Sequence, residues 1–454
     1  MFRLFRRAAA PVAAIILLVA VPVAAAQAVT IDRVVSPGGI EAWLVQDPTL
    51  PVVSLEAAFR GGAATDPADK PGLANMTASL LDEGAGPLDS QAFQRRIEDL
   101  ATSIRFSASQ DNFSTGIRTL KANLSDALGL LRLSLTEPRF DDAPVARIRS
   151  ELAIALARKA ESPNSIADRQ WRENALDHHP YAHQSDGTPE GIQRIAVDDM
   201  RGFVRQRLAR DVLTIGVVGD VTPAELGPLL DATFGALPAK AEGADVPDAK
   251  VANGGAVLLR RMPIPQTVVE FGQTGIKRND PDWYIALVVN HILGGGTFTS
   301  RLSVEVREKR GLAYSVYSYL APYQHVGLLL GGVATENSRV AQSIEIIRAE
   351  WRRMRDEGPT EEELRNAKTY LTGSFPLQFD STARIAATLV DIQQEKLGID
   401  YLDKRNAYIE AVTLADAKRV AKRLLDPDAL TFSIVGNPAN VTPTREAPKG
   451  DGRS

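Results

Sequence analysis

The chain has 454 residues, of which 44% are hydrophobic and 24% charged, and its formal net charge is −4. This composition is typical of a globular protein of two to four domains, and the small acidic excess disfavours nucleic-acid binding. Because the sequence contains no cysteine, disulfides and thiolate metal sites are excluded.

The first 26 residues are predicted to be a secretory signal peptide. Three arginines precede residues 8–23, which are almost wholly apolar, and three alanines end at Ala26. This order is typical of a leader cleaved after small residues. A membrane anchor is the alternative, but two prolines interrupt the apolar segment, which is short for a span. Cleavage after Ala26 predicts an exported, periplasmic chain with a net charge of −7.

Strands and helices are predicted to mix through the first half of the mature chain. Strands are expected at residues 40–45, 52–60, 103–119 (as an antiparallel pair) and 212–220. Helices are expected at residues 72–81, 90–100, 125–135 and 143–159, with a further helix ending near Leu176.

The second half repeats this mixture. Strands are expected at residues 256–260, 267–274, 312–320, 327–334 and 430–437. Helices are expected at residues 283–293, 299–309, 339–356 and 360–378. Thr360 and Glu363 after a proline predict a capping box at the start of the last of these helices.

The two halves indicate an internal duplication. Each ends in an apolar strand that closes on a glycine, Gly219 or Gly436, and a Thr-Pro pair follows soon after. A period of 217 residues is too long for a solenoid repeat and predicts two homologous domains. We expect an α+β fold in which each domain is a mainly antiparallel sheet with helices packed on one face.

The domain boundaries follow from composition. Residues 239–254 are rich in Pro, Ala, Asp and Gly and lack an apolar period, as a linker does. We therefore predict a signal peptide, an N-terminal domain, a linker, a C-terminal domain and a flexible tail. Their ranges are 1–26, 27–245, 246–254, 255–440 and 441–454.

Four stretches resemble the pitrilysin/insulinase family of zinc peptidases, also called inverzincins. They are residues 61–74, 179–181, 293–302 and 306–316. Their order and spacing match the family across nearly the whole mature chain, and the last two together are fairly specific. The family fold has two homologous α+β domains per subunit, which agrees with the duplication.

The resemblance places a degenerate zinc site in the first half. The family motif is His-x-x-Glu-His on one helix face, which lets two imidazoles bind zinc while the glutamate acts as general base. The matching residues here are Asn75, Ala78 and Ser79. The family's further glutamate ligand falls near Ala155, and Glu151 is a candidate one turn earlier. We therefore expect no metal, no cofactor and no hydrolysis from this chain alone.

The five histidines offer another possible metal site. They are His178, His179, His183, His291 and His325. His179 and His183 have i, i+4 spacing, but Pro180 lies between them, so a structural turn is the preferred interpretation. His291 lies in an apolar segment and is expected to be a hydrogen-bonded core residue.

Arg307 and Tyr314 are the candidate substrate-binding residues. Arg307 is expected in the last turn of a helix that ends at Gly311, and Tyr314 at the start of the next strand. In catalytic relatives an arginine and a tyrosine at this spacing grip the substrate backbone across from the zinc helix. The alternative is that Arg307 pairs with a surface carboxylate and Tyr314 is strand core.

Two other features have modest interpretations. The glycines at 294–296 lack the lysine of a phosphate-binding loop and predict a flexible bend. The strand pair at 103–119 resembles the family edge strands that bind peptide by strand addition, although a plain hairpin explains it equally well.

Some bacterial members of the family divide the work between two chains. The resemblance therefore implies the non-catalytic, substrate-gripping subunit of a heterodimeric periplasmic zinc metallopeptidase that acts on peptides or unstructured segments. The partner subunit would carry the zinc, the general base and the nucleophilic water. The alternative is a structural or peptide-binding pseudo-peptidase with no role in hydrolysis.

Overall fold

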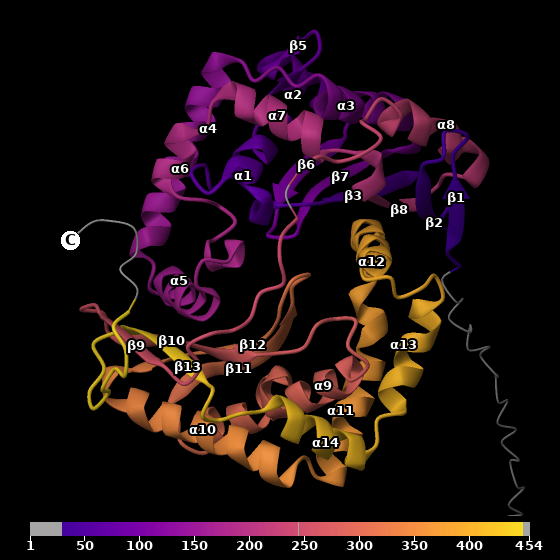
Figure 1. The fold of residues 1–454 in the computed structure, drawn as a ribbon. Helices are drawn as coiled ribbons and strands as arrows, with labels where there is room; N and C mark the ends of the chain where they lie inside the picture. Colours follow the sequence, from indigo (N-terminus) through magenta and orange to yellow (C-terminus); the bar gives the residue numbers. More distant parts are fainter. Residues whose placement is uncertain (1–29, 244, 448–454) are drawn as a thin grey trace, which may run out of the picture.

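Two β-sheets, one from each half of the chain, form the framework (Figure 1). The computed structural model describes residues 30–447 apart from residue 244, so the predicted leader lies outside the described residues. The first sheet has the order β1-β2-β8-β3-β7-β6 and the second β11-β12-β10-β13-β9. The first sheet comprises β1 (Asp32–Val35), β2 (Glu41–Gln46), β3 (Val52–Arg60), β6 (Ser103–Ala108), β7 (Asn112–Leu120) and β8 (Leu213–Gly219). The second comprises β9 (Val257–Arg261), β10 (Gln266–Thr274), β11 (Ala313–Pro322), β12 (Gly327–Glu336) and β13 (Thr431–Gly436).

The two sheets have the same topology. Strands β9, β13, β10, β12 and β11 repeat the order of β2, β8, β3, β7 and β6. In each series the first pair is parallel and the others are antiparallel. The predicted fold class and the duplication are therefore confirmed.

Glycine is required at the end of each of the two matching strands for the same structural reason. Gly219 and Gly436 have positive φ values of 142° and 154°. A Cβ at Gly219 would lie 2.1 Å from the Val52 oxygen, and one at Gly436 would lie 2.2 Å from Thr267 Oγ1. Each half therefore needs glycine where its strand passes close to its neighbour.

Helices accompany the sheet of each half, and two of them, α5 and α12, contact the sheet of the other half. The first half has α1 (Leu73–Ala78), α2 (Ser90–Asp99), α3 (Leu124–Thr136), α4 (Asp142–Glu161), α5 (Pro163–Leu176), α6 (Pro189–Arg194), α7 (Val197–Arg207) and α8 (Pro223–Phe234). The second has α9 (Trp283–Asn290), α10 (Val340–Glu357), α11 (Glu361–Gly373), α12 (Thr382–Gln394), α13 (Tyr401–Glu410) and α14 (Leu414–Leu424). The capping box of α11 is confirmed, since Glu363 accepts from the Thr360 amide at 2.7 Å and donates to its hydroxyl at 3.1 Å. No helix within the described residues has the length and apolar character that crossing a membrane requires.

Two predicted helices are shorter and less regular than expected. The segment predicted at 283–293 is α-helical only to Asn290 and continues as a π-helical turn, His291–Gly295. The segment predicted at 299–309 begins after a 3₁₀ turn and is π-helical over Ser303–Glu308. Both irregular turns lie next to β11, which packs against them.

The halves exchange one helix each. Helix α5 leaves the first half, and its Ile166 and Ala167 pack with Val435 of the second sheet. Helix α12 leaves the second half and covers Trp43 and Val218 of the first sheet. Figure 1 shows α5 lying over the second sheet and α12 beside β8 and β3. The expectation of helices on one face only is therefore incomplete, because each sheet also carries a helix from the other half on its second face.

Glycines allow both exchanged helices to approach closely. A Cβ at Gly216 of β8 would lie 2.3 Å from the Ala386 carbonyl oxygen of α12. A Cβ at Gly272 of β10 would lie 2.9 Å from the Trp171 ring of α5. The exchanged helices thus rest directly on sheet backbone.

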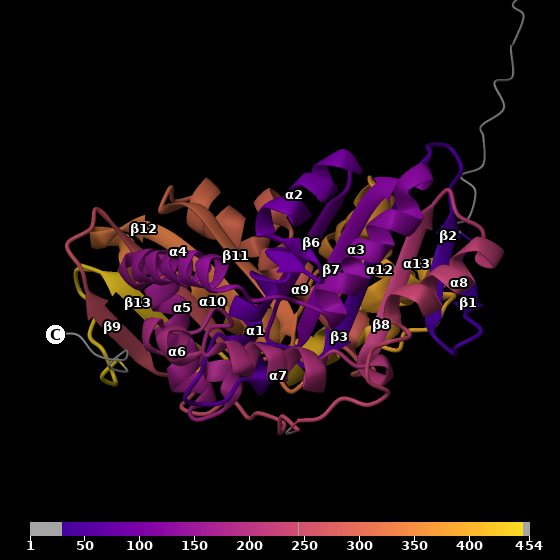
Figure 2. The same cartoon turned by 90° about the horizontal axis from the view of Figure 1, so that it is seen from above.

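The predicted linker and the described part of the predicted tail contact the folded halves. The Ala249 amide donates to the His325 carbonyl at 2.9 Å, and the Ala252 amide donates to the Ala175 carbonyl at 2.7 Å. In the predicted tail, the Thr444 hydroxyl accepts a 2.8 Å hydrogen bond from the Val257 amide. The segment between the halves is thus a strap along α5 and the β11–β12 turn (Figure 2).

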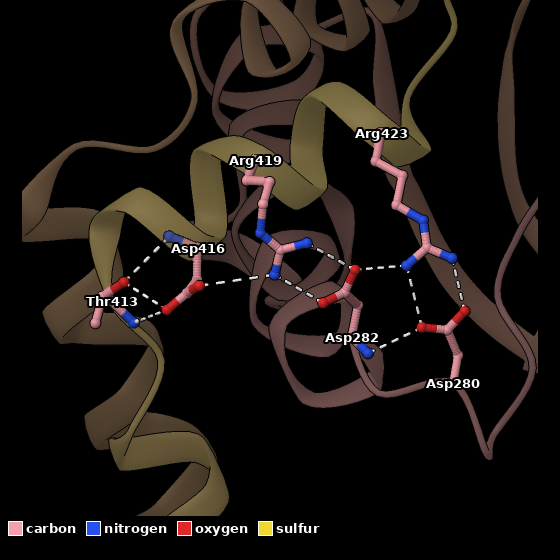
Figure 3. A network of polar contacts seen from close by, with 6 residues as sticks. All are labelled: Asp280, Asp282, Thr413, Asp416, Arg419 and Arg423. Carbon is pink, nitrogen blue, oxygen red and sulfur yellow. Dashed lines mark hydrogen bonds and ion pairs between the residues drawn. The ribbon is translucent and has the colours of Figure 1, made fainter.

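A charge network ties α14 to the segment before α9 (Figure 3). Arg419 donates two hydrogen bonds to Asp282, at 2.9 and 2.7 Å. Arg423 contacts both Asp282 and Asp280. The hydrogen bond from Arg419 is the main reason that the pKa of Asp282 falls to about 2, and Arg423 lowers it further. The carboxylate therefore remains charged well into the acid range.

Replacing Gly216 with alanine should weaken the packing of α12. The new methyl group would meet the Ala386 carbonyl, so we expect a loss of about 1–3 kcal/mol in unfolding free energy. Urea denaturation measures this loss. Gly129→Ala in α3 is the control, because its Cβ meets nothing within 4 Å and alanine favours a helix by about 1 kcal/mol. Equal stability of Gly216→Ala and wild type would show that α12 adjusts without cost.

Asp282→Asn should destabilise the chain in a pH-dependent way. The folded pKa of Asp282 lies below its unfolded value, so the network stabilises above about pH 4 and is lost as the pH falls towards 2. We expect a melting temperature several degrees below wild type at pH 7, and a difference that shrinks between pH 4 and 2. Asp198→Asn, at a 91% exposed carboxylate 3.4 Å from Arg201, is the control and should change little. A difference that does not vary with pH would contradict this assignment.

Candidate functional site

The helix at the expected zinc position is short and firmly capped. Gly72 precedes α1 with a φ of 99°, and Asp66 accepts hydrogen bonds from the amides of Gly72 at 2.8 Å and Ala74 at 3.0 Å. Burial raises the pKa of Asp66 to about 7, although these amide hydrogen bonds oppose the shift. The approach to the helix therefore keeps an N-terminal cap.

The side chains on this helix do not fit a zinc ion. Asn75 is partly buried, Ala78 is only 3% exposed, and the Ser79 hydroxyl donates back to the Asn75 carbonyl at 3.0 Å. An amide, a methyl group and a hydroxyl used for helix capping replace two imidazoles and a carboxylate. None of them is a good zinc ligand or a general base.

The third ligand position does not repair the site. Ala155 is exposed on α4 and has no ligand atom. Glu151, the alternative, pairs with Arg147 at 3.0 Å. Within residues 30–447, leaving out residue 244, no group of three or more His, Cys, Asp and Glu side chains is placed to hold a metal ion.

The loop histidines have structural roles. His179 accepts a 3.1 Å hydrogen bond from the Tyr181 amide through Nδ1, and its Nε2 lies 2.8 Å from the Pro247 carbonyl. It thereby caps the 3₁₀ turn Pro180–Ala182, as the preferred interpretation expected. His183 follows this turn and its amide donates to the Pro180 carbonyl.

The remaining histidines do not add to a metal site among the described residues. His178 is 98% exposed, and His325 lies 3.5 Å from an Asp248 carboxylate oxygen. His291 is buried and stacks on Tyr370 with 4.9 Å between ring centroids, and burial lowers its pKa. It is a core residue, but a stacking contact takes the place of the expected hydrogen bond.

Arg307 and Tyr314 lie together, and Phe298 completes the arrangement. The Arg307 guanidinium carbon is 5.1 Å from the centroid of the Tyr314 ring and 4.2 Å from that of Phe298. Gly311, with a φ of 58°, makes the turn that brings the start of β11 beside the π-helical segment. We call these three residues the aromatic–arginine sandwich.

The aromatic–arginine sandwich is open to solvent. Tyr314 is 81% exposed and Phe298 60% exposed. In the part of the chain that the structure describes, the Arg307 side chain makes no ion pair or hydrogen bond. The alternative of a carboxylate-paired Arg307 and a buried Tyr314 is therefore wrong. The guanidinium and the phenol keep free donors for a carbonyl or carboxylate oxygen.

The structure does not link the aromatic–arginine sandwich to the degenerate zinc helix. Among the described residues, no hydrogen bond, ion pair or ring contact joins Arg307 or Tyr314 to Asn75 or Ser79. The sequence did not indicate Phe298. Its only signal was an aromatic residue directly after the glycine run.

The chain resembles known proteins over almost its full length. Residues 194–371 match the family described as "Peptidase M16 inactive domain". The "non-peptidase homolog YmxG" of Helicobacter pylori is 26% identical over 86% of this chain and 90% of that protein. A crystal structure of a peptidase M16 inactive domain from Pseudomonas fluorescens has a TM-score of 0.84 and 27% identity, and covers 91% of this chain and 99% of the other. The predicted resemblance to this peptidase family is therefore confirmed. The description of the matched family as inactive and the name of the Helicobacter relative agree with the residues on α1.

A further relative of this chain is named as one subunit of an enzyme. The probable mitochondrial-processing peptidase subunit beta of Schizosaccharomyces pombe is 23% identical over 83% of this chain and 84% of that protein. This likeness bears on the proposal below.

Tight packing fixes the turn that carries Phe298. The Ser318 hydroxyl of β11 donates to the Asn290 side chain at 2.7 Å, and a Cβ at Gly294 would lie 2.3 Å from that hydroxyl. Gly294 is therefore needed for close contact with β11, and the expected flexibility of the glycine run stays a prediction.

Arg301 and Arg307 lie in the two neighbouring stretches 293–302 and 306–316, and these two arginines have different environments. Arg301 is 6% exposed and donates two 2.7 Å hydrogen bonds to Glu363 and one of 2.9 Å to the Gly358 carbonyl. It anchors the motif to the start of α11. Arg307, six residues on, is partly exposed and has no such partner.

Lysine substitutions should separate these roles. Arg301→Lys loses the bidentate contact with Glu363, and we expect a loss of about 2–3 kcal/mol in unfolding free energy. Arg307→Lys should stay within about 0.5 kcal/mol of wild type, because no fixed polar contact is lost. Urea denaturation of both variants provides the comparison. A larger loss for Arg307→Lys would mean that the aromatic–arginine sandwich is structural.

Proposed function

We propose that this M16 protein is the non-catalytic, substrate-binding subunit of a heterodimeric periplasmic zinc metallopeptidase that acts on peptides or unstructured segments. One observation carries the proposal. The positions of the family's two histidine ligands and its general base hold Asn75, Ser79 and Ala78. In contrast, a partly exposed Arg307 lies beside an exposed Tyr314, and neither has a carboxylate partner among the described residues.

The chemistry of the pair suits this role. The Arg307 guanidinium offers several N–H donors in a planar fork, and Tyr314 adds a second donor group from the same corner. Donors aimed at the carbonyl of a bound peptide stabilise the negative charge that develops on its oxygen during attack. Contact with the two rings restricts the guanidinium, so the side chain loses less conformational freedom when substrate binds.

The partner would supply what this chain lacks. A zinc-carrying M16 subunit would provide the metal, the general base and the nucleophilic water. The mitochondrial-processing relatives are named as beta subunits, which supports an assembly of more than one chain. The predicted leader, an arginine-rich start followed by an apolar segment and three alanines, supports a periplasmic site.

Substitutions in the aromatic–arginine sandwich test the shared site. In the complex purified with its zinc subunit, Arg307→Ala or Tyr314→Phe should lower kcat/KM for a fluorogenic peptide by about tenfold or more, because a donor to the reacting carbonyl is lost. Arg310→Ala is the control. This arginine follows the same turn but pairs with Glu305, so its loss should leave kcat/KM within about twofold.

The complex with the zinc subunit has to be isolated before these kinetic measurements. The mature chain, pulled down from the periplasm, should bring a second subunit with stoichiometric zinc. A metal-free, inactive chain recovered alone would favour a structural or peptide-binding role. Unchanged kcat/KM in both sandwich variants would refute the shared site even if the complex exists.

A further inference from the structure

The two sheets carry the same three-residue row on matching strands. In the first sheet Glu56 of β3 lies opposite Gly116 of β7, which lies opposite Arg105 of β6. In the second sheet Glu270 of β10 lies opposite Gly332 of β12, which lies opposite Tyr317 of β11. The internal duplication thus allows one half to be compared with the other at matching places.

In the first row the glutamate already has a cation. Arg105 lies across the glycine and forms an ion pair with Glu56. A Cβ at Gly116 would come within 2.8 Å of the guanidinium carbon and 2.5 Å of the Glu56 carboxylate. Glycine is therefore what allows the arginine of the edge strand to reach the carboxylate two strands away.

In the second row the cation is missing. Tyr317 takes the place of the arginine and lies across Gly332, where a Cβ would be 2.8 Å from the tyrosine hydroxyl. Over the residues that the structure describes, Glu270 has no ion pair and no side-chain hydrogen bond. Burial is the main reason that its pKa rises to about 8, and the charge of Asp168 adds to the rise.

The nearest arginine is already occupied. Arg172 of the exchanged helix α5 donates to Asp168 at 2.7 Å and to the Tyr323 hydroxyl at 2.9 Å. It lowers the pKa of Glu270 only in part, and it lies beyond ion-pair distance of that carboxylate. Glu270 itself is partly exposed, and Val268 and Gly272, its neighbours on the same face of β10, lie against α5.

An aromatic platform adjoins the carboxyl group on its open side. Tyr317 and Tyr319 are 45% and 41% exposed, and their rings stack with centroids 6.2 Å apart. Exposed tyrosine faces attract guanidinium groups, and a carboxylate beside them adds charge complementarity. Strand β11 is the outermost strand of its sheet among the described strands, so an extended segment can lie along it.

We propose that Glu270, Tyr317 and Tyr319 form a binding site for an arginine side chain of an extended peptide. The peptide's guanidinium supplies to Glu270 the positive charge that Arg105 supplies to Glu56 in the first half. This site is separate from the aromatic–arginine sandwich, and it requires neither zinc nor a partner subunit.

Peptide binding to the mature chain alone tests the site. The probes are a fluorescent nonapeptide with one central arginine and the same peptide with citrulline, which keeps the shape and loses the charge. Fluorescence anisotropy should show binding of the arginine peptide about tenfold tighter than that of the citrulline peptide. Glu270→Gln should remove this preference, whereas Glu56→Gln, on the row already filled by Arg105, should retain it.

Tyr317→Arg is the second variant, and it supplies an internal competitor. It rebuilds the first-half row opposite Glu270 and should weaken binding of the arginine peptide by about tenfold, with normal folding judged by circular dichroism. A wild-type chain that binds both peptides equally, or a Glu270→Gln chain that keeps the preference, would overturn the proposal.

The preference should also depend on pH. Cation binding requires the Glu270 carboxylate, whose pKa is about 8 in the free chain, so affinity for the arginine peptide should rise between pH 6.5 and 9. The groups that face Glu270 are Asp168 and Arg172 on α5, Tyr317 and Tyr319 on β11, and Tyr323. Both β11 tyrosines have raised pKa values and stay neutral over this range. Affinity that is flat with pH in wild type, or that still rises in Glu270→Gln, would count against Glu270 as the cation acceptor.

Discussion

The reciprocal exchange of α5 and α12 is the constraint on which the rest of this molecule depends. Each helix packs on the sheet of the other half, and each meets a glycine where it crosses a strand. Because neither sheet buries both faces with its own helices, the two homologous halves form one body. The strap between them and the placement of α5 beside Glu270 both follow from this arrangement.

The strands and their duplication were predictable because period-2 apolar patterns report burial directly. Residues 52–60 form β3 with the predicted limits, and the capping signals at Thr360 and Glu363 mark a real helix start. The sheet against which a helix packs is harder to predict. An apolar stripe such as Ala386 and Leu389 shows that a face is buried but not which sheet covers it. Helix α12 was not predicted at all, and the exchange therefore remained hidden.

The candidate site shows that a sequence motif does not predict the environment of each of its side chains. Arg301 and Arg307 lie only six residues apart in the sequence. Arg301 forms a buried ion pair with Glu363, whereas Arg307 contacts two exposed aromatic rings. Residue type alone does not separate these environments. Phe298 and Glu270 were missed for the same reason, since their significance comes from neighbours contributed by other strands and turns. The loss of the zinc-site residues, by contrast, could be predicted from the sequence, because the motif is defined by residue identity at fixed spacing.

The helix exchange also sets an order of events during folding. The strands of the first sheet are complete once residue 219 has been made, but Trp43 and Val218 stay uncovered until residues 382–394 exist. The strands of the first sheet are thus complete long before its second face is covered. A growing chain therefore presents an apolar sheet face while residues 220–394 are being made. Since the duplication, each half has relied on a helix encoded in the other half to cover part of its sheet.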